Sequence, residues 1–214
     1  MMTKTAYRSL GEKPDLLKSS LTVMPSPVYP DTMPLREARA QFFERSKLGD
    51  DGGYASRWVH VEAPIPFCFP NWNARVAAAR LHDLHHIAAE YATDWPGEVE
   101  IAAWEIASNC RRYSAAWLLD LAGWNVGLLI APRRMFRAFV RGRRAAHNLY
   151  KKPLLESQLD TVTVGMLRDQ LGLVTEAPNS GVGDVLGFAL WSAAVILLFD
   201  VLPLAAGIGL WRLL

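Results

Sequence analysis

The chain has 214 residues, 51% of them hydrophobic, and its mean hydropathy of +0.08 is high for a soluble protein and low for a polytopic membrane protein. This length allows one domain with a sizeable core plus an appendage. Cys68 and Cys110 are the two cysteines, and their wide separation does not support a disulfide framework or a cysteine metal cluster.

The formal net charge of +2 is unevenly distributed. Residues 133–152 carry eight lysines and arginines and no acidic residue, so the rest of the chain has a net charge of −6 (+2 minus +8). The first twenty residues contain no apolar run, and no cleavable secretory signal is therefore expected.

The first seventy residues predict short, separate elements. Residues 1–33 are polar and end in several prolines, which indicates an irregular N-terminal arm. Residues 34–48 have apolar side chains at helical spacing and predict a short amphipathic helix, which the glycine-rich turn 49–53 ends. Residues 56–69 alternate in polarity and predict a small β-hairpin whose prolines keep it at an edge.

Residues 75–91 are rich in Ala, Leu and Arg and contain neither Gly nor Pro, which favours a helix. Thr93 or Asp94 can cap a second helix, and Pro96 is tolerated in its first turn. We therefore expect two antiparallel helices joined by a short connection, with Glu98 in the first turn of the second.

Ligand-type side chains gather at this predicted helix pair. His82 and His86 are four residues apart and share one helix face, with Asp83 on the same turn. Glu98 can reach them from the facing helix. Two imidazoles and two carboxylates on facing helices predict a metal site, with His85 nearby as a residue that could orient a ligand. The alternative is a polar helix face on which His packs against Glu.

The same residues resemble the signature of the coenzyme Q biosynthesis protein four family, which reads His-Asp-x-x-His, eleven residues, Glu. Here it comprises His82, Asp83 and His86, then residues 87–97, then Glu98. The match is complete in residue type and spacing, and a weaker likeness extends from about Leu35 to Leu173. The N-terminal part and the long apolar C-terminal segment depart from the family pattern.

The resemblance implies an all-helical protein on a membrane face, a divalent metal ion and a polyprenylated aromatic substrate. Members of the family replace the ring carboxyl group by hydroxyl in an oxidative decarboxylation and help to organise the biosynthetic complex. The expected metal ligands are thus His82, Asp83, His86 and Glu98. Zinc, iron and manganese all suit such a mixed ligand set.

Three further residues are candidates near the metal. Glu105 lies two helical turns after Glu98 and could orient a ligand imidazole, or it could pair with an arginine. Arg111 and Arg112 could hold an anionic group of the substrate, although most such pairs lie on solvated surface.

Residues 115–131 form an apolar run that is short for a membrane span, and we expect a buried or interface-lying helix along which a prenyl tail could lie. A basic amphipathic helix follows. Its position between two apolar runs favours an anionic membrane surface over nucleic acid as its partner. The expected membrane-surface residues are Arg133, Arg134, Arg137, Arg141 and Arg144.

The end of the chain predicts a membrane anchor. Residues 177–184 have linker composition, and residues 185–214 are apolar except around Asp200. Twenty-seven helical residues reach about 40 Å, enough for one tilted span kinked at Pro203. Two half-helices forming a re-entrant hairpin are the alternative. The upstream positive block predicts a cytoplasmic location for residues 1–184.

Together these patterns predict a mainly α-helical bundle with a small β-hairpin in the N-terminal third and a C-terminal transmembrane or re-entrant helix. Residues 34–176 would form the metal-binding domain. The expected function is ubiquinone biosynthesis at a membrane, as a metal-dependent oxidative decarboxylase or hydroxylase of a prenylated aromatic acid. The alternative is a non-catalytic lipid-binding scaffold that gathers other quinone-biosynthesis enzymes. A His-Asp phosphohydrolase fits less well, because His60 lies on a predicted strand.

Overall fold

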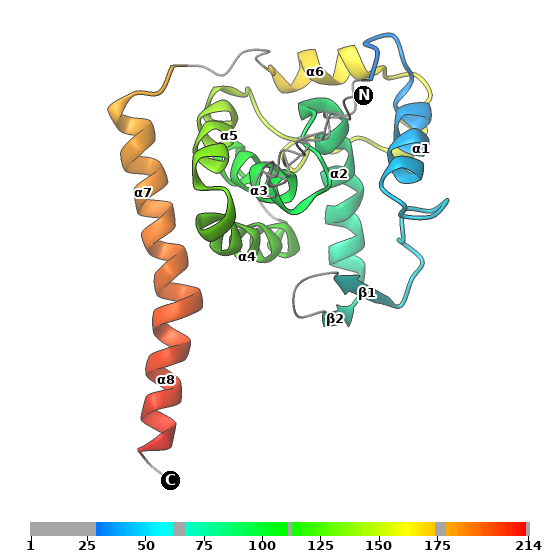
Figure 1. Cartoon of the computed structure of the whole chain (residues 1–214). Coiled ribbons are helices and arrows are strands. Elements are labelled where there is room, and N and C mark those ends of the chain that lie inside the picture. The colour runs from blue at the N-terminus through cyan, green and yellow to red at the C-terminus, as the bar shows by residue number, and fades with distance from the viewer. Residues whose placement is uncertain (1–28, 62–66, 111–112, 174–178, 213–214) are drawn as a thin grey trace, which may run out of the picture.

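The computed structural model describes residues 29–61, 67–110, 113–173 and 179–212 (Figure 1). The fold is mainly helical, as the sequence predicts. The helices are α1 (Leu35–Arg45), α2 (Asn73–Ala89), α3 (Trp95–Ser108), α4 (Ser114–Ile130), α5 (Pro132–Arg144), the 3-10 turn η1 (Glu156–Gln158), α6 (Val164–Leu171), α7 (Val182–Ile196), the π turn η2 (Leu197–Val201) and α8 (Leu202–Trp211).

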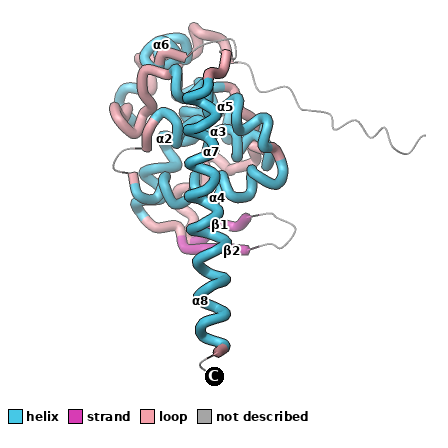
Figure 2. Tube along the Cα trace, turned by 90° about the vertical axis from the view of Figure 1, so that its left-hand side faces the viewer, coloured by secondary structure: helices cyan, strands magenta, loops and turns pink. Residues whose placement is uncertain are grey.

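The elements α1 to α6 form a helical domain, and α7, η2 and α8 continue as one long helix along its side (Figure 1). The upper half of this helix lies beside α4 and α5, whereas α8 extends beyond the domain (Figure 2). Most of residues 1–33, which we predicted as an irregular arm, lie outside the described residues. Its last part is docked, because Arg168 donates hydrogen bonds to the Tyr29 carbonyl and the Asp31 carboxylate.

Helix α3 runs through the centre of the domain. Ile101, Trp104 and Glu105 are fully buried, so this helix has protein on nearly all sides. Its close approach to α5 depends on Gly142, where a Cβ atom would lie 2.5 Å from the Trp104 carbonyl oxygen. This close packing holds the second half of the predicted metal site on a rigid element.

The predicted hairpin is present as an antiparallel pair, β1 (Trp58–Val61) and β2 (Phe67–Pro70). Trp58 pairs with Pro70 and Val61 with Phe67. His60 lies on β1, as expected, and belongs to neither group of potential metal ligands found in the described part of the chain.

The C-terminal helix begins at Val182, three residues earlier than the predicted anchor. The Asp184 carboxylate accepts a hydrogen bond from the Gly181 backbone N–H at 2.9 Å, and this contact makes residues 182–184 the first helical turn rather than part of a linker. Asp184 also binds Arg144 at 2.7 Å, which ties the start of α7 to the end of α5.

A single long helix is found in place of the re-entrant alternative. Residues Val182–Ile208 form one helix of 27 residues that is long and apolar enough to cross a membrane. Pro203 lacks the N–H that would bind the carbonyl four residues earlier, and the π turn η2 directly precedes α8 and accommodates this loss. The expected effect of Pro203 thus takes the form of a widened turn.

Several arginines of the basic helix α5 form contacts within the protein, which its sequence does not indicate. Arg134 binds Glu100 at 2.5 Å, Arg141 donates to the Ala89 carbonyl at 2.6 Å, and Arg144 binds Asp184. Arg133 and Arg137 are exposed, and no carboxylate of the described residues lies within the 4.0 Å ion-pair distance of either. Three of the five arginines predicted to face a membrane therefore contribute to the fold.

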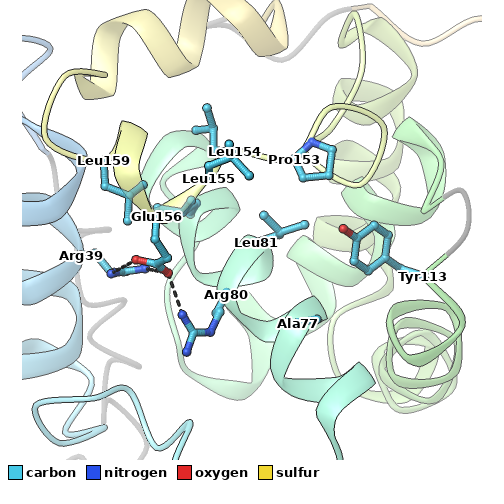
Figure 3. A pocket seen from close by; sticks show the side chains of 11 residues that line it. Arg39, Ala77, Arg80, Leu81, Tyr113, Pro153, Leu154, Leu155, Glu156 and Leu159 are labelled. Atoms are coloured by element: carbon cyan, nitrogen blue, oxygen red, sulfur yellow. Dashed lines mark hydrogen bonds and ion pairs between the residues drawn. The ribbon is translucent and has the colours of Figure 1, made fainter.

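A cluster around Glu156 joins the two ends of the domain (Figure 3). Arg39 of α1 binds both oxygens of the Glu156 carboxylate at 2.8 Å, and Arg80 of α2 binds one of them at 2.8 Å. The cluster borders a cavity of about 260 Å³ whose other lining side chains are mostly apolar. Hydrogen bonds from Arg39, together with the charges of both arginines, lower the pKa of Glu156 to about 2.

The cluster around Glu156 predicts that the folded protein loses stability in acid. Because the pKa of Glu156 is lower in the folded state, its stabilising contribution is present above about pH 4.5 and is lost as the pH falls towards about 2. Glu156→Gln should therefore lower the unfolding midpoint at neutral pH and make its pH dependence shallower in that window. Urea unfolding of the detergent-solubilised protein at several pH values measures both effects. Parallel pH profiles for the two proteins would contradict the prediction.

Candidate metal centre

The turn between α2 and α3 sets the position of Glu98. Asp94 caps α3 and accepts a hydrogen bond from the Gly97 N–H at 2.8 Å, which confirms one of the two predicted caps. Only glycine fits at position 97, because a Cβ atom there would lie 2.1 Å from the Ala92 carbonyl oxygen. The tight turn brings Glu98, in the first turn of α3, opposite α2.

Three predicted ligands converge in the structure. The Nε2 atoms of His82 and His86 lie 3.0 Å apart. The Glu98 carboxylate lies 3.4 Å from His82 Nε2 and 3.5 Å from His86 Nε2. One ligand atom from each residue falls within 4.8 Å of the other two, which is compatible with a single ion bound between them.

Hydrogen bonds on the far side of each ring determine which nitrogen faces the others. His86 Nδ1 lies 3.0 Å from the Tyr91 carbonyl oxygen, which can only accept, so Nδ1 carries the proton. His82 Nδ1 lies 3.0 Å from Glu105 Oε1, and an ionised carboxylate likewise can only accept. These partners direct both Nε2 atoms towards Glu98, where His82 Nε2 carries a proton unless a cation takes its place.

The consequence is a concentration of acceptors. Two imidazole lone pairs and a carboxylate face one another at distances that require a proton or a cation between them. Metal-binding histidines usually donate their other N–H to a carboxylate or a backbone carbonyl, and both histidines do so here. Two imidazoles and one carboxylate suit zinc, iron or manganese and leave coordination positions open for a substrate or co-substrate.

The orientation of His86 depends on an unusual backbone conformation. Glu90 ends α2 with φ 62° and ψ 31°, in the left-handed region, and the chain then turns back so that the Tyr91 carbonyl meets His86. This conformation costs a non-glycine residue about 1 kcal/mol or more. Arg168 holds the Glu90 carboxylate at 2.5 Å and stabilises the turn. On its other side His86 stacks on Phe42 of α1, with ring centroids 5.6 Å apart.

Glu105 lies behind His82 and is completely buried. Its carboxylate accepts hydrogen bonds from His82 Nδ1, from His85 Nδ1 at 2.5 Å and from the Tyr150 hydroxyl at 3.1 Å. The backbone N–H of Leu149 donates to His85 Nε2 at 2.9 Å, so His85 is a neutral donor to Glu105. Glu105 thus orients the His82 ring and is itself oriented by His85, and neither residue belongs to the group formed by His82, His86 and Glu98.

The charges of this network are consistent with these roles. Burial would raise the pKa of Glu105, but His82 and the hydrogen bonds it receives lower it well below its ordinary value. Burial opposes a charge on His82, but the Glu105 and Glu98 carboxylates outweigh it and raise the pKa of His82 well above its ordinary value, so a metal ion would have to displace a proton from this ring. Burial and the nearby Glu105 charge raise the pKa of Asp120, to which Cys110 donates at 3.1 Å. Asp120, His82 and Glu105 form a second close group, but its atoms are engaged in these hydrogen bonds.

Asp83 differs from the prediction. It does not belong to the group formed by His82, His86 and Glu98, because its carboxylate accepts a short hydrogen bond from the Tyr54 hydroxyl. Its side chain is buried, and burial raises its pKa. Asp83 still lines the same cavity as His82, His86 and Glu98, so it lies beside this group of potential ligands rather than within it.

The cavity at the centre has a volume of about 220 Å³ and lies between α1, the turn before β1, α2 and the start of α3. Glu98 is 41% exposed, so the site is open to solvent on its side. Arg111 and Arg112, the predicted substrate-binding pair, lie outside the described residues. No residue of α4 is among the described residues lining this cavity, so the predicted role of residues 115–131 in holding a prenyl tail finds no contact here.

No protein-family model matches the chain, and comparisons with curated proteins and with solved structures give no match either.

Several residues of the centre were missed by the sequence reasoning. Tyr54 lies 29 residues before Asp83, and Tyr150 lies 45 residues after Glu105. The Tyr91 carbonyl is a backbone group, which no residue pattern identifies. None of these positions has a local sequence signal, because each reaches the centre only through the packing of separate elements.

Mutations can distinguish the proposed metal ligands from the residues that lie beside them. Glu98→Gln and His86→Ala should weaken zinc binding by more than the roughly 10- to 100-fold cost of losing an outer-shell partner, because each removes a donor. Asp83→Asn should change zinc affinity by less than about tenfold. Chelator competition, together with metal analysis of the purified proteins, measures all three. Equal loss in Asp83→Asn and Glu98→Gln would place Asp83 among the ligands and contradict the structure.

Proposed function

We propose that the protein holds a divalent metal ion between His82, His86 and Glu98 at a membrane surface. It would act in polyprenyl quinone biosynthesis on a prenylated aromatic acid. The observation that carries this proposal is the convergence of two Nε2 atoms and a carboxylate, with both Nδ1 protons held by outer acceptors. The resemblance of residues 82–98 to the coenzyme Q biosynthesis protein four signature supplies the substrate class and the reaction.

A small headgroup of the substrate would bind in this cavity. His82, His86 and Glu98 would hold the metal ion, which would supply Lewis-acid polarisation of a carboxylate or phenolate oxygen and, if it were iron, a site for dioxygen. Replacement of the ring carboxyl by hydroxyl would release carbon dioxide, take one oxygen atom from dioxygen and require a two-electron reductant to carry the other to water. The protein would position the ring between α1 and α2, beside Tyr54 and Asp83, whose hydrogen-bonded side chains both line the cavity. Because α4 contributes no lining residue, the prenyl tail is proposed to extend into the bilayer.

The membrane location is proposed from α7, η2, α8 and the neighbouring helix α4. Trp117 of α4 stacks on Trp191 of α7 with centroids 5.5 Å apart. Beside this contact α4 exposes an apolar edge on which Leu129 is 86% exposed and Leu118 is 53% exposed. This edge would lie in the headgroup and upper acyl region beside the span. The exposed Arg133 and Arg137 favour the cytoplasmic side for the domain.

Quinone content tests the enzymatic proposal. Cells that depend on this protein for quinone synthesis should lose most of their quinone with Glu98→Gln or His86→Ala and keep it with Asp160→Asn, a change to an exposed carboxylate bound by Arg36. The variants must be folded and membrane-bound to count. Unchanged quinone content with folded, metal-depleted protein would exclude the enzyme. Loss of co-purifying enzymes together with quinone would instead indicate a scaffold that gathers other quinone-biosynthesis enzymes.

The proposed span predicts a labelling pattern. In a Cys68→Ser background, Leu204→Cys in α8 should resist a membrane-impermeant maleimide in native vesicles, because lipid would cover it. Gln41→Cys in α1 should react only when the cytoplasmic face is accessible. Cys110 is buried and should not contribute to the signal. Rapid labelling of Leu204→Cys in intact vesicles would contradict the proposed span.

A further inference from the structure

Arg75 lies on the metal-facing side of α2. It is seven residues, or two helical turns, before His82, and Ala79, His82 and His86 continue the same face. The Arg75 side chain lines the 220 Å³ cavity together with the three proposed metal ligands. The sequence reasoning assigned it no role, because arginine in the first turn of an alanine-rich helix carries no special pattern.

The Arg75 guanidinium is poorly satisfied for a partly buried group. Its Nε atom is buried and has no hydrogen-bond partner, whereas Nη1 donates to Asn71 Oδ1 at 3.2 Å. No carboxylate in the described part of the chain lies within the 4.0 Å ion-pair distance of it. A buried cation without an anionic partner is costly, and buried N–H donors are nearly always satisfied. The Nε atom itself is covered by protein, so the part of Arg75 available to a ligand is the part that lines the cavity.

The balance of charges around the cavity favours the binding of an anion there. A divalent ion and Arg75 contribute more positive charge than Glu98 and Asp83 can neutralise. Asp83 is already engaged with Tyr54. Glu98 is turned towards His82 and His86. Neither carboxylate lies within ion-pair distance of Arg75, although the charges of both act on it, so an incoming anion would meet a metal ion on one side and the Arg75 side chain on the other.

We propose that Arg75 binds the carboxylate of an acidic substrate within this cavity and thereby presents it to the metal centre. The inference rests on the proposed metal site and adds the residue that selects the substrate. A guanidinium presents parallel N–H donors that match the two oxygens of a planar carboxylate. The cavity is smaller than the roughly 300 to 1,000 Å³ of sites for drug-sized ligands, so it would take an acidic headgroup rather than a whole prenylated molecule.

Benzoate is the probe for this site. We would titrate the full-length, detergent-solubilised protein with benzoate by calorimetry, with and without bound zinc. Arg75→Gln should weaken benzoate binding by about 10- to 100-fold, because charge-assisted hydrogen bonds are lost. Arg75→Lys should recover part of the affinity, since it keeps the charge but not the fork. Zinc should still bind both variants, and neither should be less thermally stable than the wild type, because Arg75 makes no ion pair in the described part of the chain.

Arg137→Gln is the matched control, because it removes an exposed arginine of α5 far from the cavity lining. Inorganic phosphate is the second probe, and phosphate binding equal to that of benzoate would overturn the selection of a carboxylate. Benzoate binding unaffected by Arg75→Gln would overturn the role of Arg75, even if zinc binds as proposed. Wild-type protein that binds no zinc but shows Arg75-dependent benzoate binding would instead refute the metal centre and leave the anion site standing.

Discussion

The Glu105 carboxylate lies at the centre of the helical domain with no exposure to solvent and receives hydrogen bonds from three side chains. His82, His85 and Tyr150 come from α2 and from the segment after α5, so this one carboxylate joins α3 to two other parts of the fold. A buried carboxylate of this kind is stable only when it is fully satisfied. Its hydrogen bond to His82 Nδ1 in turn aims the opposite ring nitrogen at Glu98. The same interaction thus organises the core and orients the proposed metal ligand.

The second support of the centre comes from the connection between α2 and α3. The left-handed residue Glu90, held by Arg168, turns the chain so that a backbone carbonyl accepts from His86. Gly97 then allows the chain to pass close to Ala92, which brings Glu98 within reach of both histidines. The left-handed Glu90 and the required Gly97 lie within eight positions, and together they fix how the chain passes from α2 to α3.

The centre and the long C-terminal helix lie on different parts of the molecule. The cavity opens between α1 and α2, whereas α7 packs against α4 and α5. In the proposed membrane orientation, the apolar edge of α4 and the apolar surface of α7 would face lipid. Arg134 and Arg144 of α5 form ion pairs within the protein. In the proposed orientation, the exposed Arg133 and Arg137 are therefore the arginines of that helix that would contact lipid headgroups.

Local sequence determined the elements of this protein. The spacing of His82, His86 and Glu98, the cap at Asp94 and the apolar run after Gly181 are properties of neighbouring residues, and helix periodicity and capping follow directly from them. Tertiary structure decided which side chains meet. Asp83 turns to Tyr54, Glu105 to His85 and Tyr150, and Arg75 to an open cavity, because these contacts depend on how α1, the turn before β1 and the segment after α5 pack around α2. Long-range packing sets such contacts, and no local pattern of residues encodes the distance between two elements.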